Sequence, residues 1–467
     1  MNSGKAFGYR HAVLLITKNA PGWSSPVNRR LLYNSVAPKQ EIQETHNSSK
    51  KVSSASIKKA ALAAMNNGNV VIEIDPDHGK FLQFGNIFLR ENCQCPQCTH
   101  PDTKQRIVDT FSIPSDVKSD RIVNSPTDVT IKWSDGHISS YPRDWLSSHL
   151  GPKNPSPSKA ESQVNRAKAP RSFTAYDPSK GEPYPEVAYE AVMSKDASVL
   201  EWLEKIWKWG FCFIKGVPVD PASTKTLIER IAFIRHTHYG GFWDFTADLT
   251  FKDTAYTTEF LGAHTDNTYF TDPARLQLFH LLSHKDGQGG ESLLVDGFAA
   301  AQQLLAENPR HYAVLNTYRH PWHASGNEDV CVQPSAMAPV LSIHPDMDRV
   351  YQIRWNNYDR APKTDWGLGE QKDWYRAAQH YNTILTKKSN EIWTQLKPGT
   401  ALIFDNWRML HGRAEFTGKR RMCGGYVNND DFISRLRLLK YGREKVLKNL
   451  GNFRLGRNPS QNPYSIY

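Results

Sequence analysis

Two short motifs, far apart in the chain, constrain its fold more than any other feature of the sequence. The first is Ala263-His264-Thr265-Asp266, and the second, Arg408-Met-Leu-His411-Gly-Arg413, places His411 145 residues after Asp266. Residues i and i+2 of a strand project to the same face, so His264 and Asp266 can bind one metal ion together. An imidazole from a neighbouring strand would complete the two-His-one-carboxylate triad of non-haem Fe(II) oxygenases. The alternative is that His264 is an ordinary hydrogen-bonded loop residue.

Candidate carboxylate-binding residues lie close to these motifs. Arg420 follows His411 by nine residues and can pair in bidentate fashion with the distal carboxylate of 2-oxoglutarate. Arg421 is a rival for this role, and a surface salt bridge is the ordinary alternative for Arg420. Ser292 can add a hydroxyl to the same carboxylate, although its Gly-Gly-Glu-Ser context is equally consistent with a turn.

Three cysteines crowd into six residues, Cys93-Gln-Cys95-Pro-Gln-Cys98. Thiolates at this spacing can reach one tetrahedral ion, and structural zinc sites have four Cys or His ligands. The fourth ligand is His137, which follows an Asp-Gly turn, or His100, which lies two residues past Cys98 and so close that the geometry would be strained. Three ordinary reduced cysteines are the alternative, but the spacing favours structural zinc.

The positive charge of the chain lies at its ends. The net charge is +11, of which residues 1–60 carry +8 and residues 435–467 carry +7, so that residues 61–434 carry −4. A nucleic-acid groove needs Lys and Arg clustered on the folded surface, so we expect no nucleic-acid partner. We also expect no membrane span, because no apolar run approaches the roughly 18 residues that one requires. Six cysteines in 467 residues fit a reducing compartment.

The N-terminal residues have the composition of a targeting segment. Residues 1–40 contain six Lys or Arg, several Ser and no acidic residue, which is typical of an organelle transit peptide. Residues 41–60 are typical of a flexible extension. We therefore expect a leader and extension over residues 1–60, with a basic tail that carries no address as the alternative.

The rest of the chain divides into a small β domain, a linker and a larger strand-rich domain. The expected boundaries are 61–150 for the β domain, 151–185 for a Pro- and Ser-rich linker, 186–445 for the larger domain and 446–467 for a basic tail. In the β domain we predict strands over 70–74, 80–90 and 128–133, and a hairpin through Asp135-Gly136 into 137–141. In the larger domain we predict helices over 187–209, 222–236, 297–307 and 371–396, with a strand over 211–219. The predicted class is α+β, mainly β.

Several motifs together resemble those of one family. They are Asp253-Thr-Ala-Tyr256-Thr-Thr, His264-Thr-Asp266, Leu294-Val-Asp296-Gly297-Phe298, Asn356-Asn357-Tyr358-Asp359-Arg360 and Phe404-Asp-Asn-Trp407-Arg-Met-Leu-His411-Gly-Arg413. From about Asn69 to Leu439 the chain resembles the carnitine-biosynthesis dioxygenases, which are the γ-butyrobetaine and trimethyllysine dioxygenases among the taurine-dioxygenase-like 2-oxoglutarate oxygenases.

The resemblance implies a fold and a set of cofactors. The fold is a double-stranded β-helix (jelly roll) with helical insertions, preceded by a small β-rich zinc-binding domain. The implied cofactors are Fe(II), 2-oxoglutarate and structural zinc, with dioxygen as cosubstrate and ascorbate as reductant. The implied ligands match His264, Asp266 and His411 for iron, Cys93, Cys95, Cys98 and His137 for zinc, and Arg420 for 2-oxoglutarate.

The resemblance also implies a substrate. Thr254-Ala-Tyr256, Tyr269-Phe270 and Phe416-Thr-Gly418 favour the trimethyllysine branch, which hydroxylates Nε-trimethyllysine at carbon 3 in the first step toward carnitine. The family places an aromatic cage for the quaternary ammonium at positions matching Tyr239, Trp243, Tyr256 and Tyr426. Considered without the resemblance, each of these rings would be an ordinary core aromatic.

Asp253 is the residue that best separates the two branches. The butyrobetaine enzymes have Asn at this position, and a carboxylate here would pair with the α-ammonium that only trimethyllysine carries. Asn356 would hold the α-carboxylate. An exposed turn residue is the alternative for Asp253.

The resemblance also implies a location and an oligomeric state, and two other functions are the alternatives to the predicted one. The family implies residence in the mitochondrial matrix and a homodimer. The first alternative function is γ-butyrobetaine dioxygenase, the last step of the same pathway. The second is a zinc-containing interaction protein without catalytic activity, against which the intact metal and arginine residues argue.

Overall fold

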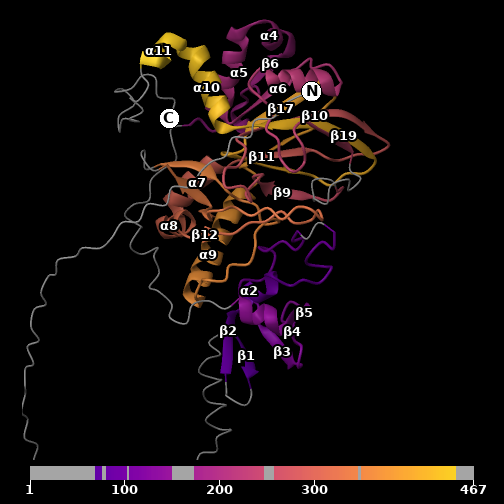
Figure 1. The fold of residues 1–467 in the computed structure, drawn as a ribbon, viewed down its shortest axis with the longest axis vertical. Helices are drawn as coiled ribbons and strands as arrows, with labels where there is room; N and C mark the ends of the chain where they lie inside the picture. Colours follow the sequence, from indigo (N-terminus) through magenta and orange to yellow (C-terminus); the bar gives the residue numbers. More distant parts are fainter. Residues whose placement is uncertain are drawn as a thin grey trace, which may run out of the picture. The chain divides into compact units, whose positions relative to one another are not determined.

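A computed structural model of the chain describes residues 69–75, 80–102, 105–149, 173–246, 257–344 and 349–448. Its N-terminal part is a small β domain (Figure 1). One antiparallel sheet pairs β1 (Asn69–Asp75) with β2 (Lys80–Gly85), and a second has the order β3 (Ser119–Asn124), β4 (Asp128–Trp133), β5 (Ile138–Pro142). Two short helices, α2 (Asn86–Glu91) and α3 (Arg143–Ser148), complete it.

The β4–β5 hairpin follows from its sequence. Alternate residues of β4 are buried (Val129, Ile131 and Trp133), as expected for a strand with one face in the core. Gly136 in the turn has φ 85°, a left-handed conformation that favours glycine. The predicted hairpin through Asp135-Gly136 is confirmed.

The larger domain consists of two antiparallel sheets of a jelly roll, which confirms the predicted fold class. The six-stranded sheet has the order β6 (Glu186–Ala188), β7 (Phe211–Lys215), β17 (Thr400–Asp405), β10 (Leu276–Lys285), β19 (Lys419–Val427), β8 (Trp243–Thr246). The four-stranded sheet has the order β16 (Glu391–Thr394), β11 (Ser292–Asp296), β18 (Met409–Arg413), β9 (Leu261–His264). Only the short β6–β7 pair is parallel within these two sheets. Strands far apart in the sequence are therefore neighbours in both.

Helices cover the outside of this domain. Helices α5 (Asp196–Trp209), α6 (Pro221–Glu229) and α10 (Asn429–Tyr441) lie beside the six-stranded sheet (Figure 1). Their side chains form one hydrophobic core with those of its strands. A second group packs beside β14 (Leu341–Ile343) and β15 (Val350–Ile353); it consists of α7 (Gly297–Glu307), α8 (Pro309–Thr317) and α9 (Leu368–Leu385). The remaining elements are α4 (Tyr189–Ser194), α11 (Arg443–Lys448), β12 (Arg319–His320), β13 (Ala338–Pro339) and a 3-10 turn, Pro178–Lys180.

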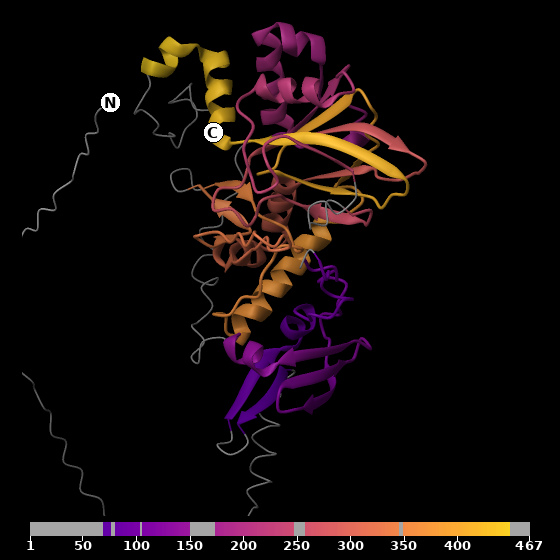
Figure 2. The same cartoon turned by 45° about the vertical axis from the view of Figure 1, so that its right-hand side comes forward.

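The two domains share contacts. Helix α9 packs against β2, as the turned view in Figure 2 shows. The fully buried Glu91 at the end of α2 accepts two hydrogen bonds from Arg360, at 2.9 and 2.8 Å, and one from Tyr375 of α9. A buried carboxylate in this position needs its cationic partner, because an unpaired buried charge is strongly destabilising.

Several predicted elements are shorter than expected or divided. The predicted strand over 80–90 is wrong in its second half, which is helix α2. The predicted helix over 187–209 begins as strand β6 and breaks at Lys195, whose φ and ψ of −136° and 128° are extended. The strand over 211–219 and the helix over 222–236 end earlier, at Lys215 and Glu229. The helix over 371–396 ends at Leu385 and is followed by strand β16, while α8 and α10 were not predicted.

Three of the expected segments fall wholly or mainly on residues that the structure does not describe. The leader over 1–60 and the linker as far as residue 172 lie outside the described residues, as does most of the tail. Within the described part of the linker, Tyr176 and Tyr184 pack against the core beside Phe211. None of the described helices is long and apolar enough to span a bilayer.

Candidate active site

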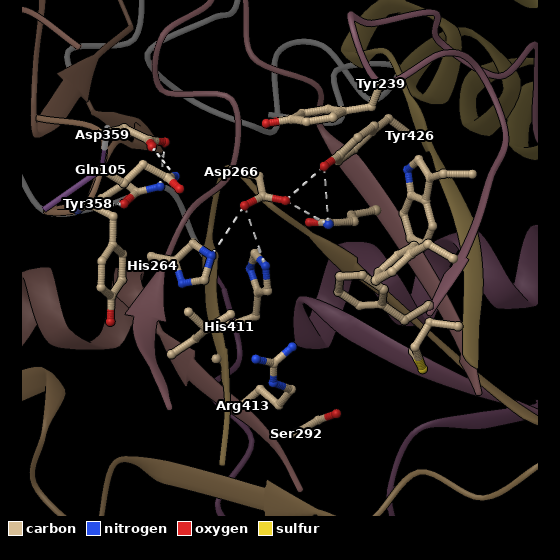
Figure 3. Close-up of a pocket in the computed structure, with 18 of the residues that line it drawn as sticks. Gln105, Tyr239, His264, Asp266, Ser292, Tyr358, Asp359, His411, Arg413 and Tyr426 are labelled. Carbon is tan, nitrogen blue, oxygen red and sulfur yellow. Dashed lines mark hydrogen bonds and ion pairs between the residues drawn. The ribbon is translucent and has the colours of Figure 1, made fainter. Parts of the chain in front are cut away.

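The motif that contains His264 and Asp266 and the motif that contains His411 meet on neighbouring strands. His264 ends β9, His411 lies on β18, and the two residues are directly paired across the sheet. Asp266 follows β9, with its Oδ1 3.3 Å from Nε2 of His264 and 3.6 Å from Nε2 of His411 (Figure 3). The three ligand atoms all lie within 4.8 Å of one another. These residues, called the triad below, have the donor set and the spacing that fit one divalent metal ion.

Hydrogen bonds fix the orientation of His264. Its Nδ1 lies 2.8 Å from the carbonyl oxygen of Gly262, and donation there leaves Nε2, on the side of Asp266, as the ring nitrogen that a metal ion can bind. The Tyr358 hydroxyl accepts the backbone N–H of Gly262 at 2.8 Å, and its ring packs edge-on against the imidazole. The ring is therefore held in the tautomer and the direction that a metal ligand needs.

Asp266 is positioned through its other oxygen and its backbone. Oδ2 accepts hydrogen bonds from Gln277 Nε2 at 2.7 Å and from the Tyr426 hydroxyl at 2.9 Å, which leaves Oδ1 for the ligand position. The Asn406 side chain accepts the Asp266 N–H at 2.8 Å and donates to its carbonyl oxygen at 3.0 Å. Asn406 thus ties the end of β9 to the turn before β18.

The electrostatics of the triad suit metal binding. Burial lowers the pKa of His411 to about 3. Burial also acts to lower the pKa of His264, but the hydrogen bond and charge of Asp266 outweigh it, and the pKa is raised. Burial raises the pKa of the Asp266 carboxyl, yet the two imidazoles hold it well below its usual range. Asp266 is therefore an anion and His411 is neutral, the states in which these side chains bind metals.

Arg420 and Arg421 have opposite environments. Arg420 lines the pocket beside the triad, is 7% exposed, and no ion pair joins it to a carboxylate of the described residues. Burial lowers its pKa to about 10, so it stays a cation at neutral pH. Arg421 forms an exposed ion pair with Asp244, with an Nε–Oδ1 distance of 2.8 Å. Because successive residues of a strand face opposite sides, β19 directs only Arg420 into the pocket.

Two more polar residues lie near Arg420. Ser292 on β11 lines the same pocket and is paired across the sheet with Arg413. Arg413 donates to the carbonyl oxygens of Thr257 and Glu259, at 2.8 and 2.7 Å. Burial, with a contribution from the charge of Arg420, lowers its pKa to about 9. A site with this much buried positive charge fits an anionic ligand.

One wall of the pocket is aromatic. Trp243 on β8 packs against Tyr426 and Phe279, with ring centroids 6.1 and 5.3 Å apart. Tyr239 accepts a weak hydrogen bond from the Tyr269 hydroxyl at 3.4 Å. The Trp243 ring lies over Gly424, where a Cβ atom would collide with the ring and with the carbonyl oxygen of Leu278. The glycine thus lets the indole lie flat on the sheet.

Asn356 lines the pocket from the loop after β15. Its Nδ2 donates to Asp359 at 2.7 Å, and its Oδ1 accepts the N–H of Tyr358 at 3.0 Å. The structure therefore brings four of the six predicted substrate-binding residues to one pocket: Tyr239, Trp243, Asn356 and Tyr426. Asp253 and Tyr256 lie outside the described residues.

A second group of side chains that could hold a metal ion lies in the N-terminal domain. The Sγ atoms of Cys93, Cys95 and Cys98 are 3.3, 3.6 and 3.4 Å from Nε2 of His137, a group called the Cys3His cluster below. Arg90 donates to Cys98 Sγ at 3.4 Å and to Asp135 at 2.7 Å, which links the cysteine loop to the hairpin that carries His137. Four donors in this arrangement fit a structural zinc ion. The geometry selects His137 over His100, whose imidazole Nδ1 instead accepts the backbone N–H of Asp102 at 3.2 Å.

Several residues that were not predicted from the sequence shape the active site. Gln277 and Asn406 hold Asp266, Arg413 adds charge near Arg420, and Gln105 and Asp359 line the pocket. Only Asn406, Arg413 and Asp359 lie in a motif that the sequence singled out. Gln105 and Gln277 lie outside every such motif, so nothing local in the sequence marks them.

A jelly roll that brings two His and one Asp to an open pocket defines a metal-dependent dioxygenase. The family described as "Taurine catabolism dioxygenase TauD, TfdA family" matches residues 173–426, more than half of the chain, and "Gamma-butyrobetaine hydroxylase-like, N-terminal" matches residues 63–147. The chain belongs to the TauD, TfdA dioxygenase family, in which Fe(II) and 2-oxoglutarate are the implied cofactors.

Within this family the chain is similar to trimethyllysine dioxygenases and, at lower identity, to a γ-butyrobetaine dioxygenase. "Trimethyllysine dioxygenase" of Neurospora crassa is 44% identical over 402 residues, which cover 79% of this chain and 83% of the relative. "Trimethyllysine dioxygenase, mitochondrial" of Mus musculus is 36% identical over 362 residues, 77% of this chain and 84% of the relative. "Gamma-butyrobetaine dioxygenase" of a Pseudomonas strain is 30% identical over 366 residues, 78% and 92% of the two chains.

Proposed function

We propose that the chain hydroxylates Nε-trimethyllysine at carbon 3 in an Fe(II)- and 2-oxoglutarate-dependent reaction, the first step of carnitine biosynthesis. The observation that carries the proposal is the convergence of the triad, Arg420 and an aromatic wall on one pocket. The pocket is lined by the triad, Arg420 and the aromatic residues together, so one site can receive both 2-oxoglutarate and the substrate. The similarity to trimethyllysine dioxygenases supports the choice of substrate.

When bound, a metal ion would supply dioxygen activation: one oxygen atom would enter the succinate formed, with carbon dioxide, from 2-oxoglutarate, and the other would enter the substrate. The residues of the chain supply positioning. His264, Asp266 and His411 would hold the ion at the wall of the pocket. Arg420 pairs with the distal carboxylate of 2-oxoglutarate, and Ser292 adds a hydroxyl to the same group. Reaction is then confined to the substrate carbon nearest the metal.

The aromatic wall binds the trimethylammonium group. This cation has no N–H to donate, so it is held by dispersion and by cation–π attraction of about 0.5–2 kcal/mol per ring. Trp243, Tyr239 and Tyr426 provide ring faces in the described part of the wall, and Tyr256 is the fourth member of the proposed cage. At the other end, Asn356 binds the α-carboxylate and Asp253 the α-ammonium.

The decisive experiment is a competition between two substrates. The anaerobically purified protein receives Fe(II), 2-oxoglutarate and ascorbate, then dioxygen, with trimethyllysine and γ-butyrobetaine together, and products are identified by mass spectrometry. We expect one oxygen atom to be added to trimethyllysine and an equal amount of succinate to form. Oxygen on γ-butyrobetaine alone would move the enzyme to the last step of the pathway. Absence of both products would contradict the proposed reaction and favour an inactive zinc-containing interaction protein.

The Cys3His cluster has a structural role in this proposal. Its four protein donors complete the tetrahedral set of a zinc ion and leave no ligand position for a substrate. The ion would join the loop over 93–98 to the β4–β5 hairpin, which carries His137. Metal analysis should find one zinc per chain.

The remaining proposals concern location and assembly. We place the enzyme in the mitochondrial matrix, supported by the basic leader composition and by animal relatives whose names include "mitochondrial". Fractionation of cells that express the full chain tests this location, and a cytosolic chain of full length would contradict it.

We further propose that the protein is a homodimer, and light scattering during size-exclusion chromatography tests this by measuring its mass. Ascorbate is proposed as the reductant that keeps the iron ferrous, tested by its effect on turnover number.

A further inference from the structure

The triad residue His264 lies on a strand at the edge of its sheet. Strand β9 is the last strand of the four-stranded sheet and pairs there with β18. An edge strand lacks the hydrogen bonds that a second neighbouring strand would supply. The direction of His264 therefore depends on contacts outside the sheet.

Two residues that follow β15, Trp355 and Tyr358, hold the backbone on both sides of His264. The Tyr358 hydroxyl accepts the N–H of Gly262 at 2.8 Å, and the carbonyl oxygen of Gly262 lies 2.8 Å from Nδ1 of His264. The carbonyl oxygen of Trp355 accepts the N–H of Thr265 at 2.7 Å. The Tyr358 ring also lies beside the imidazole, with ring centroids 5.9 Å apart (Figure 3).

Arg106 of the N-terminal domain holds the turn that contains Tyr358. Its backbone N–H donates to the carbonyl oxygen of Tyr358 at 3.2 Å, and its Nη1 donates to that of Asn357 at 2.7 Å. Arg106 is 8% exposed, and a hydrogen bond shielded from water is stronger than one in water. The position of Tyr358 therefore depends on a residue of the other domain.

The same arginine is tied to both ends of the cysteine loop. Its Nε donates to the carbonyl oxygen of Glu91 at 3.2 Å and its Nη2 to Oδ1 of Asn92 at 3.3 Å, in the two residues before the first cysteine. After the loop, the N–H of Ile107 donates to the carbonyl oxygen of Cys98 at 2.9 Å. A metal ion bound by the cysteines would fix both ends of the loop, and with them Arg106.

We propose that Arg106 is a positioning residue for the iron site, which links the Cys3His cluster through Tyr358 to His264. The proposal rests on the metal sites of the proposed function and extends them, because it makes the affinity for Fe(II) depend on the N-terminal domain. Loss of an outer hydrogen-bond partner of a metal ligand lowers metal affinity by about 10- to 100-fold. Arg106 acts one residue further out, so we expect an effect at the lower end of this range.

The test measures the affinity of the triad for Fe(II). The dissociation constant is determined under nitrogen with saturating 2-oxoglutarate, from the visible absorption of the Fe(II)–2-oxoglutarate chelate, to which the Cys3His cluster does not contribute. In Arg106→Met we expect Fe(II) to bind about 10-fold more weakly, while metal analysis still finds one zinc per chain. At saturating Fe(II), kcat should stay within twofold of the unmodified protein.

Arg143→Met is the matched control. This arginine donates to the carbonyl oxygens of Ser125 and Glu73, at 2.7 and 3.2 Å, and both acceptors belong to the N-terminal domain. The substitution removes the same side chain without touching the turn that contains Tyr358. The affinity for Fe(II) should stay within twofold.

A double-mutant cycle tests the route through Tyr358. Tyr358→Phe keeps the ring beside His264, removes the acceptor of the Gly262 N–H and should weaken Fe(II) binding by about 10-fold. If Arg106 acts through this hydroxyl, the double variant should bind Fe(II) about as weakly as either single variant. Arg106→Lys keeps the charge but loses the planar fork; it should weaken Fe(II) binding in the same direction and serves if Arg106→Met does not fold.

Each other outcome has a defined meaning. Affinity for Fe(II) within twofold of the unmodified protein in the arginine variants, with zinc in place, would overturn the proposal. Additive weakening of about 100-fold in the double variant would also overturn it, because Arg106 would then act by another route. Loss of zinc from both arginine variants would do the same, since Arg106 would then belong to the structure of the cluster. Failure of the unmodified protein to bind Fe(II) would instead contradict the proposed function.

Discussion

The Cys3His cluster takes its four donors from 45 consecutive residues, whereas the triad takes three donors from a span of 148. The cluster joins a loop to a hairpin within one small domain. The triad depends on two strands that become neighbours only when the four-stranded sheet is complete. Four protein donors close the coordination of a tetrahedral ion, while three donors facing a pocket leave positions open to ligands.

This difference separates two uses of metal binding in one chain. A closed site fixes local structure, so its loss should mainly affect stability. An open site positions reactants, so its loss should mainly affect turnover. The hydrogen bond between Gln105 and Asp359 is one place where the two regions meet, because it joins the loop beside the cluster to the wall of the pocket. Four variants test the separation.

The largest effect is expected from His411→Ala. Removal of one triad ligand should lower turnover of trimethyllysine by more than about 1,000-fold, because loss of a direct ligand exceeds the 10- to 100-fold effect of losing an outer hydrogen-bond partner. Iron content should fall and zinc content should stay constant by metal analysis. The matched control is His380→Ala, at a histidine that pairs with Glu307 on the helices. Turnover that persists in His411→Ala would break the assignment of the triad.

Cys98→Ala should mainly affect stability, in contrast to the triad variant. Loss of a zinc ligand should remove zinc and lower the free energy of unfolding by several kcal/mol, since structural zinc contributes directly to folding. Calorimetry with metal analysis measures both. Cys331→Ala makes the same change at an exposed free cysteine and should alter neither quantity. Unchanged stability of a zinc-free Cys98→Ala protein would show that the cluster does not stabilise the fold.

The two adjacent arginines of β19 provide the next test. Arg420→Gln should raise KM for 2-oxoglutarate by about 10- to 100-fold, because a hydrogen-bonded ion pair contributes about 1.5–3 kcal/mol. Arg421→Gln removes only an exposed ion pair with Asp244, worth about 0–1 kcal/mol, and KM should stay within twofold. Steady-state kinetics at saturating trimethyllysine distinguishes them. Equal effects of the two substitutions would contradict the proposed 2-oxoglutarate site.

The smallest effect is expected from the hydroxyl of Tyr426. Tyr426→Phe keeps the ring in the aromatic wall but removes the 2.9 Å hydrogen bond to Asp266. Affinity for Fe(II) should fall by about 10-fold, at the lower end of the range for such outer partners. Tyr141→Phe is the control near the other cluster; its hydroxyl donates to Leu89 O, and its loss should leave iron affinity unchanged. If both variants bind Fe(II) as tightly as the unmodified protein does, the Tyr426 hydroxyl has no part in metal binding.

Local sequence patterns predicted the elements that depend on local geometry. The i, i+2 spacing of His264 and Asp266 and the Asp135-Gly136 turn both depend on backbone conformation within a few residues. The helices over 187–209 and 371–396 were predicted too long because apolar spacing continues where the structure changes to strand. At those points, pairing with a distant strand decides that the segment is a strand and not a helix, as the pairs β6–β7 and β16–β11 show.

The features of the active site likewise divide into those that the sequence determined and those that only the tertiary structure decided. The sequence determined which side chains can bind metals, that Arg420 and Arg421 face opposite sides of a strand, and that the cysteines crowd into one loop. Only the tertiary structure decided that Arg420 is the inner one, because the register of β19 against β10 and β8 sets which face is buried. It also decided that Gln277 meets Asp266 and that Gln105 meets Asp359 across 254 residues. Such contacts join strands and loops that are distant in the chain, so their energies leave no periodic signal in the sequence.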